Sequence, residues 1–195
     1  MKESFLFLAE GFEEIEALTA VDVLRRAGIP VKTVSLTTAL QVSGAHGVTV
    51  TADLIFDNTL FSNPEWLILP GGMPGAMNLY EFTPLHGLLK NQIDSPSGRI
   101  AAICAAPLVL GQLGLLEGRK VTCYPGFENY MKGAEIVNAP VVTDDKFVLA
   151  NGPSTALQWA LTIVSETKGK EVATEIANGM LLYPKANAGL GTYFG

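Results

Sequence analysis

Short apolar runs alternate with helix-like stretches along most of this chain. The first run, SFLFLA at residues 4–9, is followed by a stretch in which Ile15, Leu18, Val21 and Leu24 recur at helical spacing before a glycine. The run WLILPGG and the run RIAAICAAP repeat this order further along. Because parallel strands need crossover helices between them, the alternation predicts an α/β sandwich with a mostly parallel sheet.

The remaining stretches fit the same plan. Further strands are expected at 31–36 and 119–124, and further helices at about 78–93, 107–116, 154–169 and 170–180. Two stretches, 42–53 and 141–150, are expected to be hairpins. With no linker, repeat or low-complexity tract, the prediction is one domain over 1–195, with a core at about 4–180 and a tail at 183–195 of unknown role.

Composition excludes several classes of protein. Hydrophobic residues make up 48% and charged residues 16%, which is a globular composition. The net charge of −6 and the absence of Lys/Arg runs argue against nucleic-acid partners. Because no apolar run approaches the ~20 residues of a membrane span, no membrane partner is expected. The apolar start is too short for a signal peptide, so a cytoplasmic location is predicted.

The chain has two cysteines, which cannot build a disulfide scaffold. Cys104 ends a predicted strand, and Pro107 suits the first turn of the helix that follows. Small residues between them allow the sharp turn of a nucleophile elbow, in which helix N–H groups point toward the sulfur. This pattern predicts a reactive thiolate, and the alternative is a buried structural cysteine. A helix N-terminus alone leaves such a thiol only half ionised, so a second stabilising group is required.

Acidic side chains supply candidates for that second group, since ligands in parallel sheets bind beyond the carboxyl ends of the strands. Glu10, Glu13, Glu14 and Glu16 fall within seven residues after the first predicted strand. Glu13 and Glu16 both head apolar helical stripes, and periodicity does not choose between them. Glu14 is aligned with Arg25 and is expected to be solvated. A buried glutamate should remain protonated and donate a hydrogen bond to the thiolate.

Other groups could complete the site. Gly71 and Gly72 follow a predicted strand and could expose backbone N–H groups, which would form an oxyanion hole with the N–H of Ala105. His46 lies in a glycine-rich turn and could reach a cleft, although a plain surface turn is the alternative. His86 is expected on an exposed helix face.

Five segments together carry a family resemblance: AEGFEEIEALTAVDVLRRAGIPV, LILPGGMPGAMNL, IAAICAAPLVL, GRKVT and LANGPSTALQWALTIV. In this order, over roughly residues 4–180, the chain resembles the ThiJ/PfpI superfamily. The resemblance is strongest to the branch that contains the Parkinson-disease protein deglycase and the bacterial chaperone YajL. It implies a flavodoxin-like three-layer sandwich, usually assembled as a homodimer.

The resemblance also assigns roles. It implies that Cys104 is the nucleophilic, oxidation-sensitive cysteine, that Glu16 is the protonated glutamate beside it, and that Gly72 and Ala105 supply the oxyanion-hole amides. His46 falls where a relative has an arginine near the site and the dimer interface. Family activities include conversion of methylglyoxal and glyoxal, repair of early glycation adducts, chaperoning and redox sensing.

One position departs from the family pattern. Many relatives have a histidine where this chain has Tyr124, and a phenol with a pKa near ~10 is a poor general base at neutral pH. Peptidase activity is therefore not expected. Cys123, one residue earlier, is expected to face away from the site and to be structural.

The resulting hypothesis is a protective enzyme that uses Cys104 and Glu16 on small reactive carbonyls, with no cofactor and no metal. Gly71, His46 and Tyr124 are possible lining residues. The alternative is a non-catalytic oxidative-stress sensor or chaperone that depends on the same cysteine.

Overall fold

The computed structural model describes residues 2–182, and the 183–195 tail considered above lies outside this range. A seven-stranded sheet runs in the order β10-β11-β7-β6-β1-β2-β5, and only β10 is antiparallel to its neighbour. These strands are β1 (Ser4–Leu8), β2 (Val31–Ser35), β5 (Leu54–Ile55), β6 (Trp66–Leu69), β7 (Arg99–Ile103), β10 (Val141–Asp144) and β11 (Phe147–Ala150). The predicted, mostly parallel α/β sheet is confirmed.

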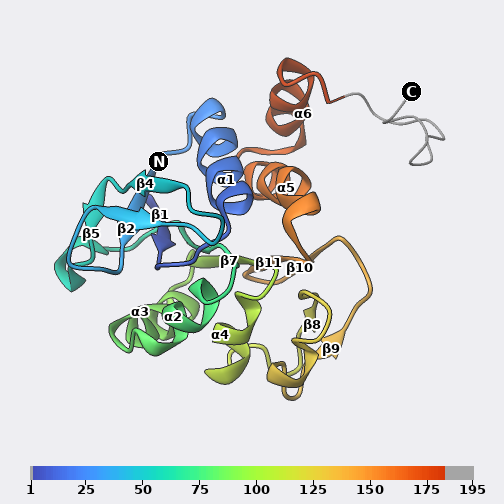
Figure 1. Ribbon diagram of the computed structural model, residues 1–195. Helices are drawn as coiled ribbons and strands as arrows, with labels where there is room; N and C mark the ends of the chain where they lie inside the picture. The colour runs from blue at the N-terminus through green and yellow to red at the C-terminus, as the bar shows by residue number, and fades with distance from the viewer. Residues whose placement is uncertain (1, 183–195) are drawn as a thin grey trace.

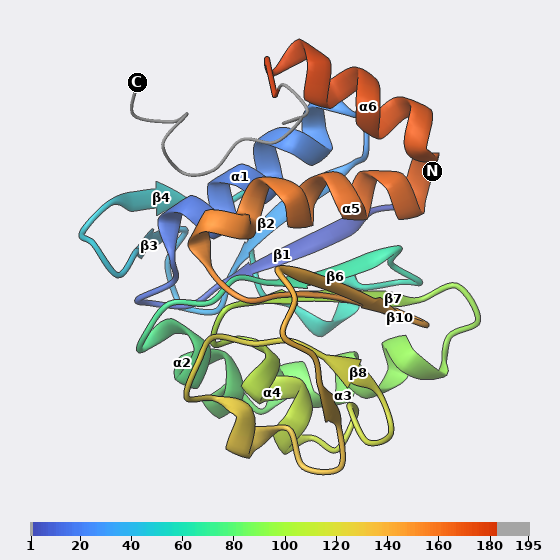
Figure 2. The ribbon, with the colours of Figure 1, turned by 90° about the vertical axis from the view of Figure 1, so that its right-hand side faces the viewer.

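Helices cover both faces of the sheet and make three layers (Figures 1 and 2). One face carries α1 (Glu14–Arg26) and α5 (Ala156–Lys168), with α6 (Lys170–Gly179) packed on the outer side of α5. The other face carries α2 (Gly75–Glu81), α3 (Pro84–Asp94) and α4 (Pro107–Gln112). Strands enclosed on both sides read as continuous apolar runs, and every residue of β1, β6 and β11 is buried.

The two largest side chains in the core are tryptophans, and each donates its indole N–H in a hydrogen bond. Trp159 of α5 donates its indole N–H to the carbonyl of Val148, and Trp66 of β6 donates to the hydroxyl of Thr167. Each tryptophan is fully buried, so an unpaired indole N–H would cost ~1–3 kcal/mol. Within residues 2–182, none of the helices has the length and apolar character needed to cross a membrane.

Several predicted elements differ in detail. The stretch 78–93 is two helices, α2 and α3, because the chain turns at Phe82 and Thr83 before Pro84 starts the second. The helix after the cysteine ends at Gln112 rather than 116. The expected strand at 119–124 reduces to β8 (Lys120–Val121), which pairs with β9 (Glu135–Ile136) outside the main sheet. Short 3-10 turns lie at Asn58–Leu60, Glu128–Tyr130 and Pro153–Thr155.

The hairpin predicted at 42–53 is confirmed as β3 (Gln41–Ser43) paired antiparallel with β4 (Thr49–Thr51), but it forms its own small sheet. Its turn passes over the start of α1, where the carbonyl of Phe12 accepts the N–H of Ala45. This contact places the glycine-rich turn beside the carboxyl end of β1.

Helix α1 buries the apolar stripes headed by Glu13 and Glu16 rather than all of the residues whose three-residue spacing indicated a helix. Ala17, Ala20, Val23 and Leu24 face the core, whereas Ile15 is 58% exposed and Leu18 is also exposed. Spacing of three residues drifts around a helix with 3.6 residues per turn, so these apolar residues do not share one face.

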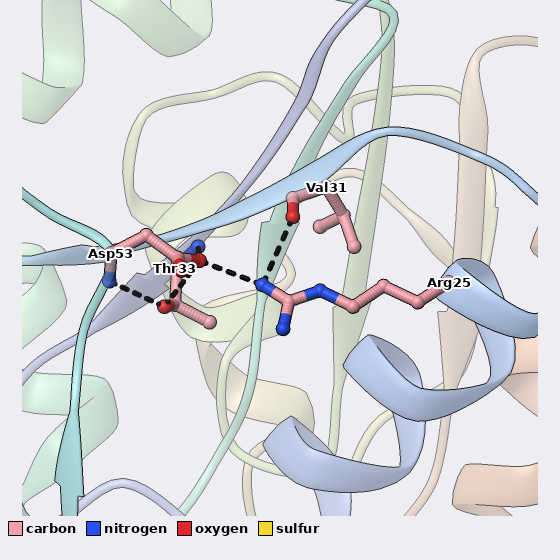
Figure 3. A network of polar contacts seen from close by, with 4 residues as sticks. All are labelled: Arg25, Val31, Thr33 and Asp53. Atoms are coloured by element: carbon pink, nitrogen blue, oxygen red, sulfur yellow. Dashed lines mark hydrogen bonds and ion pairs between the residues drawn. The ribbon is translucent and has the colours of Figure 1, made fainter.

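The far end of α1 is tied to the sheet by polar contacts (Figure 3). Arg25 pairs with Asp53 at 2.7 Å and also donates to the carbonyl of Val31, while Asp53 accepts from the backbone and hydroxyl of Thr33.

Candidate active site at the carboxyl edge of the sheet

Three loops meet at the carboxyl ends of β1, β6 and β7, as the sequence predicted for these parallel strands. The N–H of Glu13 donates to the carbonyl of Gly71 at 2.9 Å, which joins the loop after β1 to the loop after β6. The amides of Gly72 and Ala105 both approach Cys104, so the loop after β7 completes the group. Groups from three distant parts of the chain therefore lie close to Cys104.

Cys104 lies at the sharp bend between β7 and α4. Its backbone has a φ of 62°, a left-handed conformation that costs a non-glycine residue ~1–3 kcal/mol. Its N–H donates to the carbonyl of Ala150 and its carbonyl accepts the N–H of Tyr124, so both backbone groups are fixed. The side chain is 8% exposed. This is the strand–bend–helix arrangement expected from RIAAICAAP, and the bend holds the sulfur beneath an opening.

Glu16 is the glutamate that faces the thiol. It is fully buried on the first turn of α1, and its Oε2 accepts the N–H of Gly71 at 2.7 Å. Its side chain is also hydrogen-bonded to Cys104. The choice between Glu13 and Glu16 that periodicity left open is resolved in geometry, because Glu16 is the one that contacts the sulfur.

Burial dominates the charge state of this pair. It raises the pKa of Glu16 to about 7, despite hydrogen bonds from Gly71 and Cys104 that act in the opposite direction. Burial and an ionised Glu16 raise the pKa of the Cys104 thiol to about 12, whereas the amides of Gly72 and Ala105 lower it. Beside an ionised Glu16, the thiol therefore keeps its proton.

The two groups are better described together. The first proton leaves the thiol–carboxyl pair near pH 7, and the second leaves only at much higher pH. Between these limits the pair holds one proton and one negative charge. That proton can lie on sulfur or on the carboxyl group, so a thiolate beside a protonated Glu16 differs from the thiol form by one short proton transfer.

Gly71 is required by the close packing of this pair. A Cβ atom there would lie 2.7 Å from the Cβ of Cys104 and 2.8 Å from Oε2 of Glu16. Gly72 has a φ of 89°, which favours glycine, and a Cβ there would overlap the backbone near Glu13. The glycine pair after β6 therefore brings its N–H groups to the site at a distance that other residues would prevent.

A cavity of about 340 Å³ opens over the sulfur. Cys104, Gly72 and Ala105 form one part of its lining, and Glu13 and His46 form another. The remaining lining residues are Ala45, Met73, Tyr124, Phe127 and Pro153. The cavity is large enough for a small organic molecule.

Tyr124 and Phe127 make an aromatic wall, with ring centroids 6.4 Å apart in an edge-to-face arrangement. Tyr124 is 46% exposed as a whole residue. No other chemistry-bearing side chain of residues 119–124 lines the cavity. The tyrosine that replaces the expected histidine therefore does lie at the site.

Glu14 and His46 form a second group, which sequence reasoning missed because Glu14 was expected to be solvated. Glu14 is buried, and its two carboxylate oxygens accept from the N–H and from Nδ1 of His46 at 2.7 and 2.8 Å. Although burial alone would raise the pKa of Glu14, hydrogen bonds from His46 and Val48 lower it to about 2. The same carboxylates raise the pKa of His46.

Three residues considered as candidates lie outside the cavity lining. Cys123 is buried, is absent from the cavity lining, and has a pKa raised to about 11 by burial and by Glu128. His86 is half-buried, stacks on the ring of Tyr80 and bonds its carbonyl through Nε2. Glu10 is exposed and accepts the N–H of Ser43. The structure brings none of these side chains to Cys104.

Comparisons with known proteins agree with this architecture. The model of the DJ-1/PfpI family matches residues 2–166, which is most of the chain. The chain belongs to the DJ-1/PfpI family. The predicted ThiJ/PfpI resemblance and flavodoxin-like fold are thereby confirmed.

Individual relatives extend the match. Protein DJ-1 homolog B of Arabidopsis thaliana is 38% identical over 185 residues, an alignment that covers 94% of this chain and 42% of the relative. The chain thus spans less than half the length of that plant protein. The glutathione-independent glyoxalase DJR-1.2 of Caenorhabditis elegans is 34% identical over 175 residues, with 89% and 92% of the two chains covered.

A solved structure of Toxoplasma gondii DJ-1, described as oxidized, superposes with a TM-score of 0.89 at 34% identity. The alignment covers 95% of this chain and all of that one.

Proposed function

We propose that this protein converts small reactive dicarbonyls, such as methylglyoxal or glyoxal, into hydroxy acids by cysteine-dependent catalysis. The observation that carries the proposal is the Cys104–Glu16 pair, in which Cys104 lines a cavity, Glu16 is buried beside it and two amides donate to the sulfur. A thiol, a carboxyl group with a pKa near neutrality and two amides are sufficient for the chemistry, and no bound cofactor is needed. Similarity to a protein named as a glutathione-independent glyoxalase supports the same reaction class.

The first step is addition of the thiol to the aldehyde. The sulfur of Cys104 forms a bond to the aldehyde carbon, and its proton passes to the carboxylate of Glu16. The carbonyl oxygen takes the electron pair of the broken π bond. Amide groups of Gly72 and Ala105 stabilise that oxyanion, which then takes the proton from Glu16 to give a hemithioacetal and a free carboxylate.

The second step moves a proton between carbons. Glu16 removes the proton from the former aldehyde carbon, and an enediol forms. Return of a proton to the neighbouring carbon gives a thioester of the hydroxy acid on Cys104. Water then cleaves the thioester and releases the acid and the thiol, so methylglyoxal plus water yields lactic acid. A pKa near 7 suits a group that must both accept and donate this proton.

Turnover of methylglyoxal by purified wild type, Cys104→Ala and Glu16→Gln tests this mechanism. Loss of a positioned acid–base group costs ~10²–10⁴-fold in rate, so both variants should fall at least a hundredfold below wild type. Equal rates in all three proteins would eliminate the mechanism. The same variants assayed on early glycation adducts would show whether deglycation uses the same pair.

A second function is favoured by one specific observation. The amides directed at Cys104 and the neighbouring Glu16 could equally hold a sulfinate, the two-oxygen product of cysteine oxidation. The T. gondii relative was solved in an oxidized state. In this alternative the protein is an oxidative-stress sensor or chaperone without turnover. A stable two-oxygen adduct confined to Cys104 after mild peroxide, together with negligible dicarbonyl turnover, would favour it.

We also propose that the protein acts as a cytoplasmic homodimer. Exposed apolar side chains of Ile15 and Leu18 on α1, together with Val48 of the neighbouring turn, offer a surface that a second copy could cover. Sedimentation of wild type and Leu18→Glu tests this assembly: the charge should shift the protein toward the monomer.

A further inference from the structure

A mixed cluster of nitrogen and oxygen donors lies at the rim of the cavity. Nδ1 of His46 is 2.8 Å from Oε2 of Glu14 and 3.4 Å from Oε2 of Glu13. One donor atom from each residue falls within 4.8 Å of the other two. Tetrahedral zinc ligands with bonds of ~2.0 Å are separated by about 3.3 Å, so the spacing needs only small side-chain adjustments to hold an ion.

Glu14 is fixed in place before any ligand arrives. Its Oε1 accepts the N–H of His46 at 2.7 Å and the N–H of Val48 at 3.3 Å, which leaves Oε2 directed at the imidazole. A Cβ on Gly44 would overlap this carboxylate, so the glycine permits the close approach. Contacts of this kind orient the ligands of metal sites.

Glu13 provides the independent evidence. Its side chain is more than nine-tenths buried, yet within residues 2–182 its carboxylate accepts no hydrogen bond; its nearest cationic group is His46 at 3.4 Å. Its backbone is anchored through the N–H donated to Gly71. A carboxylate that is mostly buried and accepts no hydrogen bond is stabilised by a positive partner. Glu13 lines the cavity, so such a partner can reach it from solvent.

We propose that Glu13, Glu14 and His46 bind a divalent transition-metal ion, with Zn²⁺ the best match. Binding of the ion would release the proton on Nδ1 of His46 and leave two carboxylate charges, which a divalent cation would neutralise. An imidazole and two carboxylates suit zinc, whereas magnesium and calcium prefer sites composed entirely of oxygen. The His46 side chain is 71% exposed, so Nε2 can keep its proton when Nδ1 binds the ion. The ion would lie at the part of the cavity lining that Glu13 and His46 supply, and the dicarbonyl reaction proposed above does not depend on it.

Zinc titration of the untagged full chain against a chromophoric chelator tests the site. The measurement is made in Cys104→Ala, which removes the reactive thiol as a competing ligand. One Zn²⁺ per chain should bind, and Mg²⁺ should not compete. Glu13→Gln and His46→Gln, each added to Cys104→Ala, should weaken zinc binding at least tenfold. His86→Gln is the matched control and should leave the affinity unchanged.

Cobalt provides a second readout that does not rely on affinity. Co²⁺ bound to wild type should give visible ligand-field bands without a thiolate-to-cobalt charge-transfer band, and His46→Gln should lose those bands. Circular dichroism of each variant confirms the fold. Equal zinc affinity in Glu13→Gln and the parent, loss of binding in Cys104→Ala, or a thiolate band with Co²⁺ would each overturn the proposal.

Discussion

Glu14 and Glu16, two glutamates on the first turn of α1, differ in their hydrogen-bond partners and in their pKa values. Glu14 faces the hairpin turn and accepts hydrogen bonds from the backbone of His46 and Val48 and from the imidazole, so its pKa falls to about 2. Glu16 faces the sheet edge, accepts the amide of Gly71 and meets a thiol, and its pKa rises to about 7. Both residues are buried. The difference shows that burial alone does not set the pKa of a carboxyl group. The number of hydrogen-bond donors that the carboxylate accepts from also sets it.

The different hydrogen-bond donors around Glu14 and Glu16 give the two carboxyl groups different roles. Glu14 remains ionised at physiological pH and anchors the turn, which is a structural task. Glu16 is close to half protonated at neutral pH and can pass a proton in either direction. A helix turn with one residue between the two carboxyls therefore contains a permanent anion and a proton-transfer group.

The largest expected effect is a pH-dependent gain in stability for Glu16→Gln. A carboxyl group whose pKa rises from 4.5 to about 7 on folding contributes its full stability below pH 4.5 and loses it as pH rises through 7. Gln remains neutral, so the variant should gain about 3 kcal/mol over wild type between pH 4 and pH 8. Urea unfolding at both pH values measures this, and a constant difference would contradict it.

The opposite trend is expected for Glu14→Gln. A pKa lowered from 4.5 to about 2 contributes stability above pH 4.5 that is lost as pH falls toward 2. After allowance for solvent near the exposed His46, the variant should lose about 2 kcal/mol at pH 7. Urea unfolding at pH 7 and pH 3 should show this deficit shrinking with acid. If the free energy of unfolding changed with pH in the same direction for the Glu14 and Glu16 variants, the two carboxyl groups would not differ in charge state as described.

The third prediction concerns the reactivity of Cys104. Because the Cys104–Glu16 pair loses its first proton near pH 7, alkylation by iodoacetamide should rise to half its plateau near that pH. Without the carboxylate, a buried thiol titrates at or above its ordinary ~8.5, so Glu16→Gln should react at least about tenfold more slowly at pH 7. Glu3→Gln, an exposed change, serves as the control. Superimposed profiles would show that Glu16 does not control the thiol.

The smallest effect is expected for His46→Gln. The imidazole is 71% exposed, and the two backbone N–H groups continue to hold Glu14 after it is removed. The loss of unfolding free energy should be roughly less than half of that for Glu14→Gln. Thermal unfolding of the two variants side by side measures the ratio, and an equal loss would assign the anchoring to the ring.

Much of the fold could be read from local signals. The apolar runs of β1, β6 and β7 and the closing glycine at Gly28 predicted elements whose order alone implied a parallel sheet. The convergence of three loops followed from that topology, and so did the place of Cys104. These inferences succeeded because they rest on periodicity and on the common direction of parallel strands.

Pairings between distant residues were not predictable in the same way. Nothing near Glu14 in sequence indicated that a turn 32 residues away would supply its donors. The exposure of Ile15 and Leu18 likewise depends on where α1 rests against α5, which spacing does not reveal. The charge state of Cys104 required the identity of its neighbour, because the same helix start beside a cation would have produced a thiolate.

The left-handed backbone at Cys104 has an evolutionary corollary. Glycine would adopt that bend without strain. Replacing the cysteine by glycine should therefore remove the backbone strain, and it also removes the thiol. Selection for robustness alone would favour that exchange. A lineage that keeps cysteine at this bend therefore keeps a strained backbone conformation, and the function of the thiol is the reason to keep it.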